Sequence, residues 1–184
     1  MRFALVLGVL LVSAPASAGE LQLDAGVAVR KSTWRGDWAS GGQLGLGYRF
    51  ARVLSIDFLA WEELARVDRR LNTGITAGVT GTLPLATIRP SLRLYVIHQH
   101  EEGWVSVAEH PFGVVAGIGP GIRHRAGFGT KLGLEIPFSK KKHVEWVANT
   151  GFDMTFFPDA SLGASAYFGV MGGIGLNYSL PELP

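Results

Sequence analysis

The stretch that most constrains this chain is the closing run 164–180, which reads ASAYFGVMGGIGLNYSL. Apolar side chains dominate its even positions, whereas its odd positions are mostly small or polar, and this alternation lasts longer than an ordinary globular strand. About ten residues of this kind suit a tilted strand that crosses a bilayer. Because an open sheet edge cannot exist in lipid, such a terminal strand must close a sheet. The even positions are Ala166, Phe168, Val170, Gly172, Ile174, Leu176, Tyr178 and Leu180.

The same period of two recurs upstream and predicts seven further strands. Short links alternate with longer ones, which is typical of barrels with tight turns at one end and external loops at the other. The segment 112–122 (FGVVAGIGPGI) leaves a ninth or tenth strand open, although Pro120 argues against a central strand there. The predicted upstream strands are 21–30, 43–50, 54–60, 75–83, 91–96, 128–136 and 144–154, and the longer links are 31–40, 62–72, 99–123 and 157–163.

The first residues predict a secretory signal peptide, 1–18. Arg2 precedes an apolar run, 3–12, that is too short to span a membrane, and Ala16 and Ala18 form an Ala-x-Ala cleavage signal. An uncleaved membrane anchor is the alternative. We therefore expect a single mature domain, 19–184, that is exported through the inner membrane.

Composition excludes several classes of protein. The chain has no cysteine, so it has neither disulfides nor thiol chemistry. Its formal charge of +2 falls to +1 when Arg2 leaves with the signal peptide, which does not favour nucleic acid as a partner. A hydrophobic fraction of 47% argues against disorder despite 25 glycines.

Glycines on the polar face favour a membrane barrel over a soluble β-sandwich. Glycine weakens a water-facing strand, whereas the narrow interior of an eight-stranded barrel has room only for modest side chains. We therefore predict an all-β, closed antiparallel up-and-down transmembrane barrel, with eight strands or, alternatively, ten. The polar-face glycines are Gly26, Gly45, Gly47, Gly78, Gly129, Gly133, Gly151, Gly169, Gly173 and Gly175.

Aromatic residues gather toward both ends of the predicted strands. Amphipathic rings prefer the two interfaces of a membrane, so two belts are expected of a spanning barrel. The inner belt would hold Tyr48, Phe50, Phe138, Trp146 and Tyr178, and the outer belt Trp34, Trp38, Trp61, Phe156, Phe157 and Phe168.

In this pattern, residues 20–180 resemble the small eight-stranded outer-membrane proteins typified by OmpA and OmpX. The ending 175–180 (GLNYSL) is similar to the C-terminal signal read by the barrel-assembly machinery, although Leu180 replaces the usual terminal aromatic residue and 181–184 trail behind. The resemblance implies that residues 19–184 form a barrel domain in the outer membrane of a Gram-negative bacterium. It also implies outer-membrane lipid and lipopolysaccharide as surroundings, and the assembly machinery as a partner.

Charged residues of both signs fall on the predicted inner face. Buried charges must be paired or hydrated, so we expect a network of ion pairs that closes the barrel, with a narrow ion or proton path as the alternative. A wide pore is not expected at this strand number. The predicted interior charges are Asp24, Arg30, Arg49, Asp57, Arg93, Lys131, Glu135, Glu145 and Asp153.

A histidine cluster is the one candidate for site chemistry. His98, His100 and His124 share one face by parity, at the outer rim, and three imidazoles can bind zinc or a similar divalent ion. Glu101, Glu102 and His110 are possible additional ligands. The alternative is a polar rim that contacts lipopolysaccharide. No other cofactor is expected.

An enzymatic alternative comes from a second resemblance. Lipid A deacylases are outer-membrane barrels with a lipid-facing His-x-Ser pair, and His98 is similar in face and register. The residue two positions on is His100, so the expected serine nucleophile is missing, and Ser106 is the only nearby substitute. We therefore favour a non-enzymatic barrel that contacts lipopolysaccharide or a protein partner through its loops, by way of Trp34, Trp38, Arg66, Arg69 and Arg70.

Overall fold

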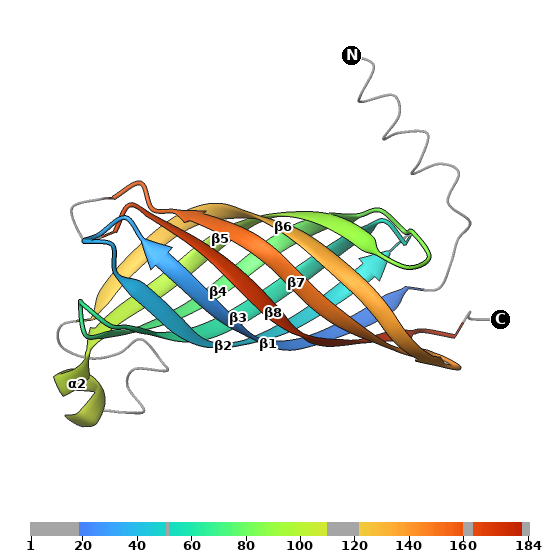
Figure 1. The fold of residues 1–184 in the computed structure, drawn as a ribbon, viewed down its shortest axis with the longest axis horizontal. Helices are drawn as coiled ribbons and strands as arrows, with labels where there is room; N and C mark the ends of the chain where they lie inside the picture. The colour runs from blue at the N-terminus through green and yellow to red at the C-terminus, as the bar shows by residue number, and fades with distance from the viewer. Residues whose placement is uncertain (1–18, 51, 110–121, 160–163, 182–184) are drawn as a thin grey trace, which may run out of the picture.

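The protein forms a closed eight-stranded barrel. The computed structural model describes residues 19–50, 52–109, 122–159 and 164–181. Each strand pairs antiparallel with the next, and the last closes on the first, so the predicted eight-stranded barrel is confirmed (Figure 1). The elements are β1 (Glu20–Ser32), β2 (Trp38–Phe50), β3 (Leu54–Ala65), β4 (Arg70–Thr82), β5 (Arg89–Gly103), α2 (Trp104–Glu109), β6 (Arg123–Lys141), β7 (Val144–Phe156) and β8 (Ala166–Ser179).

Strand β8 closes the sheet along its whole length. Its ladder with β1 runs from Glu20 opposite Ser179 to Ser32 opposite Tyr167. β1 begins and β8 ends at one end of the barrel, which we call the turn end, and α2 lies at the other, which we call the loop end (Figure 1). Closure leaves neither terminal strand with an unpaired edge, as a sheet in lipid requires.

Large apolar side chains cover the outside of the barrel. In a β-sandwich the apolar residues of the predicted strands would be buried against one another, but Leu44, Ile75, Leu134 and Ile174 are 68%, 58%, 42% and 54% exposed. They therefore do not meet in a shared dry core, which rules out the β-sandwich alternative. Within the part of the chain described, no helix is long and apolar enough to cross a membrane.

Interior glycines make room for large side chains on neighbouring strands. A Cβ added at Gly129 would overlap the Tyr95 ring, and one at Gly78 would lie 2.8 Å from Nε of Arg93. The steric reason inferred from the sequence for polar-face glycines therefore holds at these two positions.

An apolar cluster fills part of the interior. Trp61 and Phe157 are only 3% and 2% exposed, so the prediction that they belong to an outer aromatic belt is wrong. Trp61 stays in regular register with both neighbouring strands, without a bulge. The other members of the cluster are Tyr95, Ile97, Ala164 and Tyr167.

Elsewhere in the interior a cavity of about 100 Å³ is lined mainly by polar residues, among them Asp57 and Arg93.

The strands extend further toward the loop end than the alternation of apolar residues predicts. β3 continues to Ala65 and β4 begins at Arg70, so the expected link 62–72 shrinks to 66–69. β5 likewise includes 99–103, which were expected to be loop. Strand pairing continues where the apolar band has ended, because the backbone still needs partners. The predicted signal peptide and nearly all of the candidate strand 112–122 lie outside the described residues.

Candidate functional site

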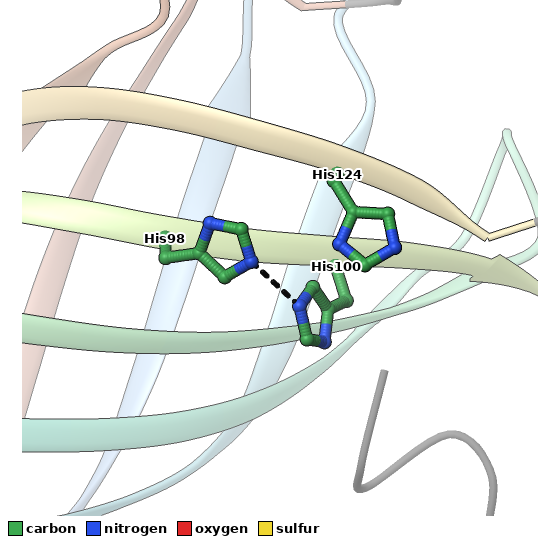
Figure 2. A group of neighbouring side chains, drawn as sticks. All are labelled: His98, His100 and His124. Atoms are coloured by element: carbon green, nitrogen blue, oxygen red, sulfur yellow. Dashed lines mark hydrogen bonds between the residues drawn. The ribbon is translucent and has the colours of Figure 1, made fainter. Parts of the chain in front are cut away.

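Three histidines meet on the outer surface near the loop end. His98 and His100 are two residues apart on β5, and His124 lies directly opposite His100 on β6, so strand periodicity places all three on one face. Their ring centroids are 4.6–5.6 Å apart, and Nε2 of His98 lies 2.8 Å from Nε2 of His100 (Figure 2). One ligand nitrogen from each ring lies within 4.8 Å of the other two.

The histidine cluster lies just beyond the apolar band of β5, whose last member is the 63%-exposed Val96. His98 and His124 are exposed, and His100 is partly buried. Two residues further along the same face, Glu102 is only 1% exposed and accepts a hydrogen bond from the Ser106 hydroxyl on α2. Its second carboxylate oxygen, Oε2, has no hydrogen-bond partner among the described residues.

The other candidate ligands behave differently. Glu101 points into the barrel, where its carboxylate pairs with Arg125 at 2.8 Å and with Gln99 at 2.9 Å, so the suggestion that it adds to the metal site is wrong. His110 lies outside the described residues. The histidine cluster is the only group of three or more possible ligands found in the described part of the chain.

Interior charges near the loop end form one compact group. The Arg30 guanidinium lies 3.3 Å from Glu63 and 3.1 Å from Asp153, and it stacks over Trp61 at 4.3 Å. Side chains in this group are at most 3% exposed. These charges are therefore compensated inside the barrel rather than by bulk water.

A second group of interior charges lies near the turn end. Arg49 bridges Glu20 at 3.0 Å and Glu135 at 2.7 Å. Arg89 bridges Glu135 at 2.6 Å and Glu145 at 2.5 Å. The shared carboxylate of Glu135 joins both arginines into one network.

The remaining predicted interior residues lie around the central cavity. Arg93 pairs with Asp57 and contacts the Thr76 hydroxyl at 2.8 Å. Asp24 accepts a hydrogen bond from Asn149, and Lys131 lines the same cavity. Sequence reasoning missed at least five interior charges among the described residues, because they fall in the expected links or at the rim, or were not considered. Continuing the strand parity finds them. They are Glu20, Glu63, Arg89, Glu101 and Arg125.

A group of cationic and aromatic residues at the β1–β2 and β3–β4 links, here called the loop-end collar, comprises Lys31, Trp34, Arg35, Trp38, Arg66 and Arg69. Each tryptophan has a cation nearby: Lys31 Nζ lies 5.6 Å from the Trp38 ring, and the Arg35 guanidinium lies 5.4 Å from Trp34.

Two links are joined at the collar. The Asp37 carboxylate accepts backbone N–H bonds from Val67 and Asp68 at 2.8 and 2.9 Å, and Arg66 N donates to the Trp38 carbonyl at 3.1 Å. Arg66 and Arg69 are exposed, whereas Arg70 is partly buried and pairs with Asp68 at 2.9 Å, so the charge of Arg70 is already paired and Arg70 is left out of the collar.

Comparison with known proteins identifies the fold. No protein-family model matches the sequence, and no curated protein is significantly similar to it. Solved structures do match. The N-terminal β-barrel domain of Pseudomonas aeruginosa OprF has a TM-score of 0.57 and 14% identity, with 89% of this chain and 100% of that chain covered.

Two further structures agree. Neisserial surface protein A (NspA) has a TM-score of 0.58 and 16% identity, with 90% of this chain and 99% of that chain covered. Ail of Yersinia pestis, solved in complex with the heparin analogue sucrose octasulfate, has a TM-score of 0.53 and 13% identity, with 88% of this chain and 99% of that chain covered. The chain therefore has the fold of small eight-stranded outer-membrane barrels.

Proposed function

We propose that this chain is a non-enzymatic outer-membrane barrel that binds the phosphorylated head groups of lipopolysaccharide through its loop-end collar. The observation that best supports this proposal is the position of the collar, just beyond the apolar outer surface of the barrel. Tryptophan prefers the membrane interface, and Lys or Arg near an anionic membrane surface contributes about 1 kcal/mol each. Arg35 lies on one of the two joined links and Arg66 and Arg69 lie on the other, so the hydrogen bonds of Asp37 hold cations of both links in the same region.

The interior supports a role at the surface rather than in transport. The apolar cluster around Trp61 and the buried Arg30 group occupy the interior toward the loop end, and eight strands enclose little further space. A wide diffusion path does not fit this packing. Assembly would use the outward face of β8, where Leu176 and Tyr178 offer the apolar residues suited to the barrel-assembly machinery.

Membrane integration gives the first test. We expect the expressed protein to resist extraction by urea from the membrane fraction, because its large apolar exterior needs lipid. We also expect unboiled samples to migrate differently from boiled ones on denaturing gels, since a closed barrel resists unfolding by detergent. A urea-soluble protein with a single gel mobility would contradict the proposal.

Binding to lipopolysaccharide gives the second test. The triple variant Arg35→Gln/Arg66→Gln/Arg69→Gln should bind lipopolysaccharide-containing vesicles on the order of 100-fold more weakly than the wild type, given about 1 kcal/mol for each of the three cations. The difference should shrink at high salt, which screens exposed charges. Binding would be measured by co-flotation of the refolded barrel with vesicles.

The matched control removes the same charge from the opposite end. Lys140→Gln/Lys141→Gln/Lys142→Gln changes three exposed cations at the β6–β7 turn and should leave binding unchanged. Equal losses in the two triple variants would reduce the effect to net charge and overturn the assignment to the collar. Unchanged binding in both would overturn it as well.

A further inference from the structure

The histidine cluster has a chemistry that the proposed lipopolysaccharide contact does not need. We propose that His98, His100 and His124 form a binding site for one divalent transition-metal ion, such as Zn²⁺, on the outer surface of the barrel near the loop end. The inference stands on geometry, with three imidazoles from two paired strands on one face and their ligand nitrogens within 4.8 Å.

The distances suit a single ion. Zinc binds imidazole nitrogen at about 2.0–2.1 Å in a tetrahedron, which places ligand nitrogens about 3.3 Å apart. The nearest pair, Nε2 of His98 and Nε2 of His100, is 2.8 Å apart, and the third ring lies within 4.8 Å. Small side-chain rotations reach the required spacing, while the β5–β6 ladder fixes the backbone, with His100 and His124 directly opposite each other.

The ligand set selects the class of metal. Imidazole suits Zn, Cu and Ni, whereas Mg and Ca prefer oxygen ligands. Three protein ligands leave one coordination position of a tetrahedral ion for water or another oxygen donor. His98 and His124 are exposed, so that position is accessible from outside the barrel.

A buried carboxylate beside the cluster supplies an independent reason for a cation. Glu102 lies close enough to His100 to interact with it electrostatically. It is 1% exposed, and its Oε2 lacks a hydrogen-bond partner among the described residues, an arrangement that is costly for an anion. A bound divalent ion offsets that cost. Glu102 therefore acts on the site through its negative charge, two residues beyond His100 on the same face of β5.

Zinc titration of the purified, EDTA-treated barrel in detergent tests the site. Calorimetry should give one Zn²⁺ per barrel. His100→Gln should weaken binding more than about 100-fold, since even changes behind the ligands cost about 10–100-fold. Glu102→Gln should weaken zinc binding by only about 10–100-fold. Binding should weaken as the pH falls, because protons compete with the metal for the imidazole nitrogens.

His143→Gln provides the matched control, because it removes one histidine at the opposite end of the barrel, in the β6–β7 turn. It should bind zinc as the wild type does, and heat-modifiable gel migration should show that every variant is folded. Absence of stoichiometric zinc in the wild type would overturn the proposal. Equal losses in His143→Gln and His100→Gln would overturn it too. Lipopolysaccharide is absent from this experiment, so its outcome is separate from that of the vesicle assay.

Discussion

Replacing Arg30 with methionine should destabilise the barrel by about 3–5 kcal/mol, the usual cost of breaking a buried ion pair by removing one partner. The substitution leaves two carboxylates, Glu63 and Asp153, without their countercharge, and both side chains are 2% exposed. It also removes the cation stacked on Trp61. Urea unfolding of the refolded barrel in detergent, followed by tryptophan fluorescence, measures the change in the free energy of unfolding.

Removal of all three charges separates packing from electrostatics. The triple variant Arg30→Met/Glu63→Gln/Asp153→Asn should recover most of the loss, because replacing a whole buried ionic group is often nearly neutral. Arg35→Met removes an exposed arginine of the β1–β2 link and should change stability by no more than ~0.5 kcal/mol. A single Arg30→Met variant as stable as Arg35→Met would show that the interior group carries no such penalty.

The partners of Arg30 show where sequence reasoning stops. Parity alone places Arg30 and Asp153 inside, since alternating residues share a face. Their pairing depends on the three-dimensional stagger of the barrel, because β1 and β7 are not neighbours in the sheet. Glu63 was assigned to a link, since the apolar signal of β3 fades before the strand ends. The alternation therefore predicts well which side chains face the interior, but it predicts the ends of the strands poorly.

The histidine cluster was predictable to a similar degree. Spacing of two residues on one strand and the strand order suffice to put His98, His100 and His124 on one face. The burial of Glu102 was not predictable, because it depends on α2, a six-residue helix that no periodic pattern in the sequence predicts. Glu101 and Glu102 are adjacent in sequence but lie on opposite faces, so only the first joins the interior network.

Replacing Leu94 with arginine should cost about 2–4 kcal/mol of stability in lipid vesicles, the range for a cation at the middle of a lipid-facing strand surface. Leu94 is 61% exposed and lies between Leu92 and Val96, at the centre of the outward apolar run of β5. In a water-soluble protein, such an exposed position would accept arginine with little change. The sign and size of the change in stability therefore show whether lipid or water surrounds the outer face of β5.

Val67→Arg is the control for that measurement, because Val67 is equally exposed at 57% but belongs to the β3–β4 link. The link lies beyond the strands, so its new cation stays hydrated and should cost no more than ~0.5 kcal/mol. The comparison holds the chemical change and the exposure nearly constant and varies only the position along the barrel. Equal costs at both positions would mean that no hydrocarbon surrounds β5, and the membrane assignment would then fail along with the proposed contact of the collar with lipopolysaccharide.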